Sequence, residues 1–137
     1  MQVDTMQNLA KQISEYNIYQ SLTKYYHHPG ITLFRQRELL EIGNYMNQFP
    51  ISIEKCILDL GCGEGHIGDM LFNKIDIGLD LTRDEVKKAR ELPVYKNVVT
   101  ADAKRIPFSD RTFDIVFSNS VIEHILGIEQ VVSEVSR

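Results

Sequence analysis

The stretch CILDLGCGEGHIG, residues 56–68, decides the fold class of this chain. A short apolar run over residues 56–58 ends at Asp59, and glycines follow at positions 61, 63 and 65 before a segment with helical potential, residues 66–72. Glycine has no side chain to block an approach, so a strand that breaks into glycines before a helix brings backbone N–H groups close to a ligand. The stretch therefore predicts a strand, a tight turn and a helix arranged around a flat, polar ligand.

The size and composition of the chain indicate a single domain of the ordinary soluble class. It has 137 residues, of which 43% are hydrophobic and 25% charged. No run approaches the roughly 18 apolar residues of a membrane span, and the N-terminus lacks the layout of a secretory signal. The two cysteines, Cys56 and Cys62, fit neither a disulfide framework nor a four-ligand zinc site. We therefore expect a reduced, cytoplasmic protein with no metal site and no membrane partner.

The charge pattern argues against a nucleic-acid partner. The net charge is −4, and the densest basic stretch, residues 83–90, is interleaved with acids. A protein that binds nucleic acid usually carries a basic stripe. A small molecule is therefore the expected binding partner.

Residues 1–50 are predicted to form an N-terminal helical cap in front of the first strand. Apolar residues at steps of three and four predict one helix over residues 3–26, which His27-His28-Pro29-Gly30 ends. A second helix is predicted to begin with Thr32 as its N-cap and to end at Pro50. Its expected buried residues are Leu33, Phe34, Leu39, Ile42, Met46 and Phe49.

Residues 51–137 are predicted to form an α/β, Rossmann-like core. Strands are expected at residues 56–60, 75–80, 97–100 and 113–118, alternating with helices at 65–72, 83–92 and 128–137. This alternation predicts parallel strands joined by right-handed crossovers, in a partial doubly wound sheet of order 3-2-1-4. Because four strands are few for such a sheet, we expect the core to be incomplete at its C-terminus and the fourth strand to have an open edge. That edge is expected to be exposed or covered by an oligomer contact.

Polar residues follow each of the predicted strands. Asp59 belongs to the glycine turn, Asp80 ends the second strand, Asp102 follows the third, and residues 118–120 (Ser-Asn-Ser) end the fourth. In an open parallel sheet, ligands bind at the carboxyl ends of the strands. Three acids and a glycine turn at one edge suit a nucleoside that carries positive charge and few or no phosphates.

Two other nucleotide sites fit the turn less well. The dinucleotide pattern G-x-G-x-x-G requires glycine at position 66, which is His66, and Asp59 would repel a pyrophosphate. A P-loop is excluded because no Gly-Lys-Ser/Thr follows the turn. An NAD-dependent oxidoreductase therefore remains a low-ranked alternative.

Three motifs in order resemble the class I S-adenosylmethionine (SAM)-dependent methyltransferases, and most of all the small-molecule group called type 11. They are DLGCGEG at 59–65, GLD at 78–80 and ADAKRIPFSDRTFDIVFSNSVIEHI at 101–125. The resemblance covers residues 55–137. Members of this family continue beyond a Glu-x-x-Arg helix, here Glu134 to Arg137, into three more strands, which matches the expected incomplete core.

The resemblance implies SAM as the cofactor, with S-adenosylhomocysteine as its product, and assigns a role to each matching residue. The glycine turn lies against the methionine part, Asp80 holds the ribose hydroxyls beside Leu81, Asp102 and the Ala103 N–H face the adenine, and Asn119 makes a backbone contact. The implied cofactor-binding residues are Asp59, Gly61, Cys62, Gly63, Gly65, Asp80, Leu81, Asp102, Ala103 and Asn119.

The implied reaction is methyl transfer to an oxygen, nitrogen or carbon nucleophile of a small molecule. His124, just beyond the fourth strand, is the candidate general base, with a packing role as the alternative. Asp80 as a helix cap and Asp102 as a solvated loop acid also remain open. A second hypothesis is a non-catalytic SAM-binding or interaction module, which the expected missing strands favour.

Overall fold

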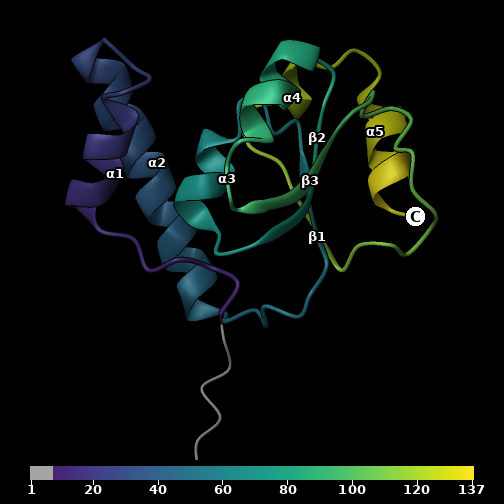
Figure 1. The fold of residues 1–137 in the computed structure, drawn as a ribbon, viewed down its shortest axis with the longest axis horizontal. Coiled ribbons are helices and arrows are strands. Elements are labelled where there is room, and N and C mark those ends of the chain that lie inside the picture. The colour runs from purple at the N-terminus through teal and green to yellow at the C-terminus, as the bar shows by residue number, and fades with distance from the viewer. Residues whose placement is uncertain (1–7) are drawn as a thin grey trace, which may run out of the picture. The chain divides into compact units, whose positions relative to one another are not determined.

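The computed structural model describes residues 8–137, which form two compact units (Figure 1). The described part of the N-terminal unit runs to Ile53 and includes Met70–Asn73. The second unit consists of Glu54–Asp69 and Lys74–Arg137. No helix among the described residues is both long and apolar enough to cross a membrane.

The N-terminal unit contains two helices, α1 (Glu15–Leu22) and α2 (Pro29–Gln48). The prediction that Thr32 caps the second helix is wrong, because the N-cap is His28, whose Nδ1 accepts a hydrogen bond from the Gly30 N–H at 3.2 Å. Pro29 occupies the first helical turn, where its fixed φ favours the helix and its missing N–H has no cost. Thr32 lies inside α2, and its hydroxyl donates to the Tyr26 carbonyl at 3.1 Å.

The prediction of one helix over residues 3–26 is also wrong, since only α1 is helical in the described part of that range. Before α1 the chain is extended and forms isolated β-bridges, with Asn8 opposite Ser52 and Ala10 opposite Phe72. The Leu9 N–H donates to the Ile51 carbonyl at 2.8 Å. Apolar spacing alone did not distinguish a helix from an extended segment whose hydrogen bonds go to distant residues. Val3 and Met6, the first apolar positions of that prediction, lie outside the described residues.

The buried stripe of α2 is narrower than predicted. Leu39 and Met46 are buried as expected, together with Thr32 and Gly43. Three predicted core residues are instead largely exposed: Leu33 (55%), Phe34 (69%) and Phe49 (59%). A straight helix presents one stripe at a period of 3.6 residues, and positions 33 and 34 lie beside that stripe.

The second unit is a four-stranded parallel sheet of order β3-β2-β1-β4, which confirms the predicted fold class. The strands are β1 (Ile57–Leu60), β2 (Ile75–Asp80), β3 (Tyr95–Thr100) and β4 (Ile115–Phe117). The remaining elements are α3 (His66–Leu71), α4 (Arg83–Ala89), the 3-10 helix η1 (Ile122–His124) and α5 (Ile128–Val135). Strand β3 begins two residues earlier than predicted, at Tyr95 instead of Asn97.

Strand β1 lies at the point where the strand order reverses. Leu58 of β1 is paired with Ile77 of β2 on one side and with Val116 of β4 on the other. The chain passes outward through β2 to β3 and then returns to add β4 beside β1. Such a reversal opens a crevice at the carboxyl ends of the two diverging strands, where ligands bind in open α/β sheets.

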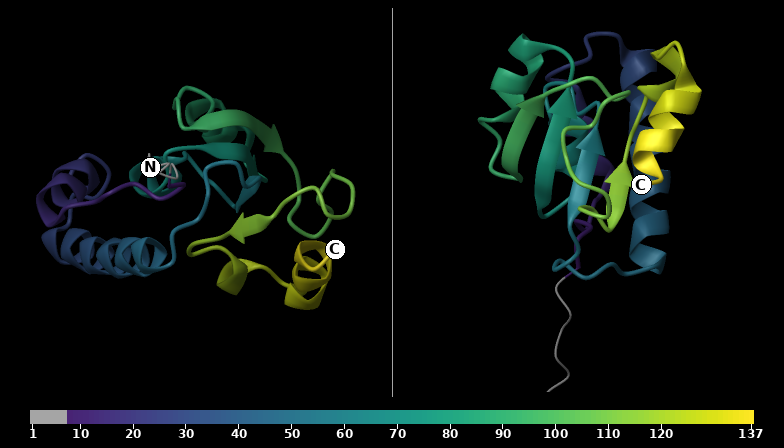
Figure 2. Two further views of the ribbon diagram at one scale, coloured as in Figure 1. Left: turned by 90° about the horizontal axis from the view of Figure 1, so that it is seen from below. Right: turned by 90° about the vertical axis from the view of Figure 1, so that its right-hand side faces the viewer.

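Helices cover the two faces of this sheet (Figure 2). Helix α4 contacts β2 and β3 through its buried residues Val86 and Ala89. Helix α5 lies on the opposite face and contributes Val131 to an apolar cluster formed with Leu58, Leu60, Leu79, Ala103 and Ile106. Within the described residues β1 is the only strand neighbour of β4, so β4 has the open edge that the sequence predicted.

Candidate functional site

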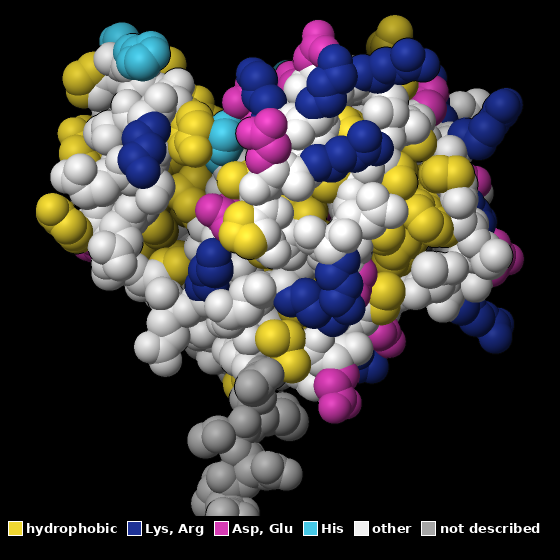
Figure 3. All heavy atoms as spheres, viewed as in Figure 1, with side chains coloured by type: hydrophobic (Ala, Val, Ile, Leu, Met, Phe, Trp, Pro, Cys, Tyr) yellow, Lys and Arg dark blue, Asp and Glu magenta, His cyan; other side chains and the backbone are white. Residues whose placement is uncertain are grey.

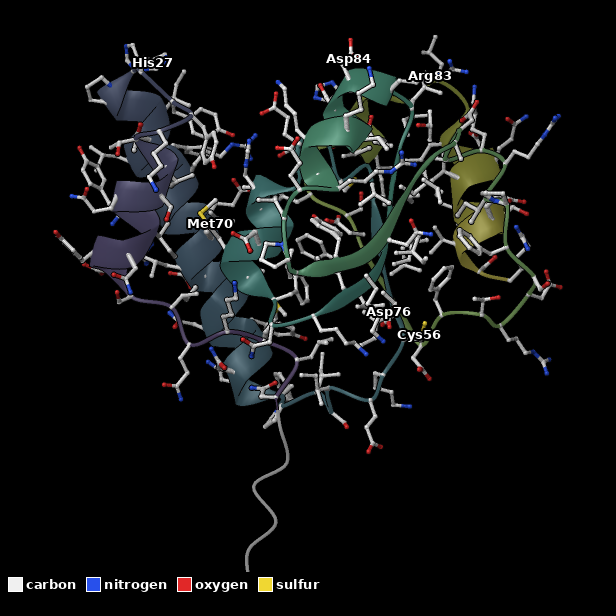
Figure 4. The ribbon with its side chains drawn as sticks, viewed as in Figure 1. His27, Cys56, Met70, Asp76, Arg83 and Asp84 are labelled. Atoms are coloured by element: carbon white, nitrogen blue, oxygen red, sulfur yellow. The ribbon has the colours of Figure 1, made fainter. Side chains whose placement is uncertain are left out.

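The parallel sheet brings the predicted site residues to one edge. The glycine turn follows β1, Asp80 ends β2, Asp102 follows β3 and Asn119 follows β4. Figure 4 shows Arg83 and Asp84, which begin α4, at this carboxyl-end edge, and Cys56 and Asp76 toward the opposite edge. The carboxyl ends of β1 to β4 therefore form the candidate site.

The glycine turn has a backbone that other residues adopt only under strain. Gly61, Gly63 and Gly65 have φ values of +76°, +54° and +86°. The turn is closed onto β2, because the N–H groups of Gly61 and Cys62 donate to the Leu79 carbonyl at 2.7 and 3.0 Å. A Cβ on Gly61 would lie 2.4 Å from the Val121 methyl groups, so the segment after β4 packs directly on the turn.

Asp80 holds the middle of the turn. Its Oδ2 accepts a hydrogen bond from the Gly63 N–H at 2.9 Å, and its Oδ1 accepts from the Thr82 N–H at 2.8 Å. The N-cap of α4 is Thr82, two residues later, so Asp80 does not cap this helix from the N-cap position. Each carboxylate oxygen has two lone pairs and uses one here, which leaves acceptor capacity for hydroxyl groups of a ligand.

Asp59 is buried beneath the turn, with 3% of its surface exposed. Its Oδ2 accepts a hydrogen bond from the Tyr95 hydroxyl at 2.6 Å. Burial and, to a smaller extent, the charge of Asp80 raise the pKa of Asp59 to about 7, against the lowering effect of the Tyr95 hydrogen bond. Tyr95 was not predicted as a site residue, because nothing in the sequence indicates that the first residue of β3 reaches β1.

Cys62 lies within the turn and remains a thiol. Burial raises the pKa of Cys62, and the charges of Asp59 and Asp80 raise it further. A thiol in such surroundings is a poor nucleophile. Cys62 therefore contributes packing and a backbone N–H group to the turn rather than covalent chemistry.

The residues predicted to lie beside an adenine sit in two loops. Leu81, after β2, exposes 69% of its surface. Asp102, after β3, accepts a hydrogen bond from the Lys104 N–H at 2.9 Å, and its side chain is partly exposed. Ala103 is buried in the apolar cluster below. Among residues 8–137, no backbone carbonyl accepts a hydrogen bond from the Ala103 N–H.

The segment after β4 closes the site on the other side of β1. The Ser118 hydroxyl donates to the Leu60 carbonyl at 2.9 Å, which ties the end of β4 to the start of the turn. Ser120 has a φ of +55°, and Asn119 beside it is half-buried. His124 lies in η1 with 76% of its side chain exposed, and its Nε2 is 3.9 Å from Glu123 Oε1. Its role as a general base stays a prediction.

One further acidic residue near the turn, Glu85, was not predicted as a site residue. Glu85 Oε2 of α4 lies 3.3 Å from the position that a Cβ on Gly63 would take. Partial burial raises the pKa of Glu85, as do the charges of Asp80 and Glu64. Glu64 itself accepts hydrogen bonds from Lys88 and from His66, which lower its pKa. The charge closest to the turn is thus predominantly negative, which suits a cationic ligand.

The acidic side chains of the site are arranged as hydrogen-bond acceptors. Among residues 8–137, no group of three or more His, Cys, Asp or Glu side chains is arranged so that it could hold a metal ion. The acids at the strand ends instead bond backbone N–H groups and Tyr95. They are hydrogen-bond acceptors in a polar site.

Comparison with known proteins places this site in a family. Residues 58–137 match the model of the family described as methyltransferase domain. Malonyl-[acyl-carrier protein] O-methyltransferase of Legionella pneumophila is 30% identical over 126 residues, covering 87% of this chain and 41% of that protein. Norajmaline N-methyltransferase of Rauvolfia serpentina is 31% identical over 109 residues, covering 73% of this chain and 37% of that protein.

A solved structure supports the same fold. The SAM-dependent methyltransferase of Thermotoga maritima superposes with a TM-score of 0.62 at 20% identity, covering 88% of this chain and 55% of that one. The chain spans about two-fifths of the length of the two curated relatives. With the glycine turn, the strand-end acids and the sheet order in agreement with the family match, the chain belongs to the methyltransferase domain family of class I SAM-dependent methyltransferases.

Proposed function

We propose that this chain binds SAM at the carboxyl ends of β1 to β4 and supports methyl transfer to a small-molecule acceptor. The observation that carries the proposal is the clasp between Asp80 and the glycine turn, in which the Gly63 N–H donates to Asp80 Oδ2 at 2.9 Å. The clasp places a carboxylate with free lone pairs directly beside three left-handed glycines. In this proposal the backbone of the glycine turn and the Asp80 carboxylate, as the acceptor for the ribose hydroxyls, contact the cofactor side by side.

The residues of the site fit SAM in charge and in polarity. A sulfonium cofactor is cationic at its reacting centre. The acids in or beside the turn are Asp59, Glu64, Asp80 and Glu85. Leu81 offers an exposed apolar side chain for the flat face of a base. Lys88, a base beside the turn, is paired with Glu64. These features favour a cationic nucleoside over a dinucleotide with its pyrophosphate.

When bound, SAM supplies an electrophilic methyl group, which a lone pair of the acceptor takes as the sulfur leaves as a neutral thioether. The contribution of the chain is to hold the cofactor in a fixed orientation, through the glycine backbone, Asp80 and the loops after β3 and β4. We propose His124 as the group that accepts the acceptor's proton where the acceptor is not already a good nucleophile.

A small-molecule acceptor is favoured by the charge of the surface and by the relatives. In Figure 3, Lys and Arg side chains alternate with Asp and Glu rather than forming a basic stripe on the visible face. Two of the pairs over α4 are Lys87 with Asp84 and Lys88 with Glu64. The relatives named above methylate oxygen and nitrogen according to their names. We propose an oxygen, nitrogen or carbon nucleophile.

The second candidate is a SAM-binding module that does not transfer the methyl group by itself. It is favoured by the exposure of the candidate base, because 76% of the His124 side chain is exposed. The two candidates share the cofactor site and differ only in turnover.

Isothermal titration calorimetry with SAM and S-adenosylhomocysteine tests the shared site. We expect both to bind, and we expect Asp80→Asn to weaken SAM binding by about ten-fold or more, since a charged hydrogen-bond acceptor is lost. Asp84→Asn is the matched control, with the same charge change at an exposed side chain of the first turn of α4. No binding by the wild-type chain would overturn both candidates.

Turnover distinguishes the two candidates. S-adenosylhomocysteine formation is followed while a panel of small-molecule hydroxyl, carboxyl and amine acceptors is offered. Acceptor-dependent product supports the methyltransferase, and its loss in His124→Ala with intact SAM binding supports the proposed base. Binding without turnover on any acceptor supports the module.

A further inference from the structure

Tyr95 connects β3 to residues of β1 and of the glycine turn that lie 36 and 30 residues earlier in the chain. It is the first residue of β3, its side chain is buried, and its hydroxyl lies 2.6 Å from Asp59 Oδ2 of β1 and 3.3 Å from the Gly65 carbonyl of the turn. A phenol has one proton to donate, and the shorter distance assigns it to Asp59. Burial also raises the pKa of the Tyr95 hydroxyl, so it stays protonated and remains a donor.

The Tyr95 side chain lies so close to three glycines that it leaves little room for a Cβ at their positions. A Cβ on Gly65 would lie 2.7 Å from Tyr95 Cε2, one on Gly68 would lie 2.2 Å from the Tyr95 hydroxyl oxygen, and one on Gly78 would lie 3.0 Å from the ring. Gly78 of β2 is the register partner of Asp59 of β1. A side chain at Gly78 would therefore obstruct the path of the Tyr95 ring toward Asp59.

We propose that Tyr95 is a positioning residue for the cofactor, whose ring supports the glycine turn and whose hydroxyl holds Asp59 as a buried anion beneath the sulfonium. The inference rests on the proposed function, because it assigns the cationic sulfur of SAM as the group that the anion favours. It predicts that SAM, which carries a sulfonium, and S-adenosylhomocysteine, which carries a neutral sulfur, respond differently to the ionisation of Asp59.

The pKa of Asp59 depends on the titratable groups that surround its carboxylate. Tyr95 faces it from β3, Asp80 from the end of β2 and Cys62 from the turn, while Asp69 of α3 acts on Tyr95. Of these, Tyr95 favours the anion through its hydrogen bond, and Asp80 disfavours it by like charge. The thiol of Cys62, whose pKa is raised, is neutral over the range of interest.

The test is the ratio of the two dissociation constants, S-adenosylhomocysteine over SAM, measured by calorimetry between pH 5.5 and 9. In the wild-type chain we expect the ratio to rise with pH through a midpoint at about 7, because ionised Asp59 favours the sulfonium. In Tyr95→Phe, which keeps the ring and loses the hydroxyl, we expect the midpoint to move up by about one pH unit. SAM binding at pH 7 should then weaken several-fold.

Two further variants keep the test decisive. Asp59→Asn should make the ratio independent of pH at its low-pH value, and it provides the test if Tyr95→Phe does not fold by circular dichroism. Tyr16→Phe, the same change at an exposed tyrosine, should reproduce the wild-type profile. A Tyr95→Phe or Asp59→Asn profile identical to wild type overturns the inference alone. Failure of the wild-type chain to bind SAM at any pH overturns the proposed function and the inference together.

Discussion

The glycine turn and the N-terminal helices hold their shapes in different ways. The turn is held by its backbone, with three left-handed glycines and N–H groups bonded to Leu79 and Asp80. Helix α2 is held by a narrow stripe of buried side chains, of which Leu39 is completely buried while Phe34 is exposed. A turn that depends on an unusual backbone conformation tolerates few residue types at each position. A helix that packs through one buried stripe tolerates many residue types at its exposed positions. Substitutions in the two regions should therefore differ in sign as well as in size.

The largest contrast is expected for the same glycine substitution in each region. In Gly65→Ala, the alanine must adopt a φ of +86°, and its Cβ would lie 2.7 Å from the Tyr95 side chain and 2.8 Å from the Leu92 side chain. Left-handed strain and overpacking together should lower the free energy of unfolding by about 2–4 kcal/mol, and SAM binding should be lost. Urea unfolding and calorimetry measure the two effects.

Its counterpart is Gly30→Ala in the first turn of α2. Gly30 does not have a left-handed φ, and the atom nearest to a Cβ added there would be in the His28 ring, at 3.2 Å. Alanine is the better helix former by about 0.5–1 kcal/mol, so the unfolding free energy should be unchanged or slightly higher. A loss from Gly30→Ala as large as that from Gly65→Ala would contradict the distinction between the two regions.

The next prediction concerns the stripe of α2 itself. Leu39→Ala should cost about 2–4 kcal/mol of unfolding free energy, because Leu39 is completely buried. Phe34→Ala, although it removes the larger side chain, should cost less than about 0.5 kcal/mol, because Phe34 is largely exposed. Thermal unfolding of the two variants decides between the observed stripe and the wider one expected from the sequence.

A smaller effect is expected where α5 holds the loop between β3 and β4. The Arg137 guanidinium donates to the carbonyls of Ile106 and Phe108, each at 2.7 Å, and Glu134 accepts from the Ile106 N–H. Arg137→Ala should make exchange of the Ile106 amide hydrogen about ten-fold faster. Arg37→Ala, which breaks the exposed ion pair with Glu41 in α2, is the control and should leave local exchange unchanged.

A further prediction concerns the pH dependence of the unfolding free energy. An aspartate in an unfolded chain titrates near pH 4, and Asp59 in the folded chain has a pKa of about 7. Between these values the folded chain binds more protons than the unfolded one, so the contribution of Asp59 to the unfolding free energy falls as pH rises and is fully lost above about 7. Urea unfolding between pH 5 and 8 should show a shallower decline in Asp59→Asn. An equal slope in both proteins would contradict the burial of the Asp59 charge.

Most of the second unit could be predicted from the sequence because its signals are local. The glycines at 61, 63 and 65, the apolar strands and the acids at their ends each specify a nearby backbone, and parallel topology then brings them to one edge. The N-terminal unit was predicted less well, since residues 8–10 obtain their hydrogen bonds from residues 51–52 and 71–73. The spacing of apolar residues in the sequence does not indicate such distant hydrogen-bond partners.

The sequence by itself determined the Rossmann-like class and the polar edge at which Asp80 and Asp102 lie, because alternating strands and helices favour parallel strands whose carboxyl ends meet at one edge. The strand order then follows from the Rossmann-like pattern. Only the tertiary structure decided that Asp59 faces inward to Tyr95, that Gly78 leaves room for the Tyr95 ring, and that Glu85 stands beside the turn. Those contacts join residues on different elements, and side-chain packing across a sheet depends on register and twist rather than on neighbouring residues in the chain.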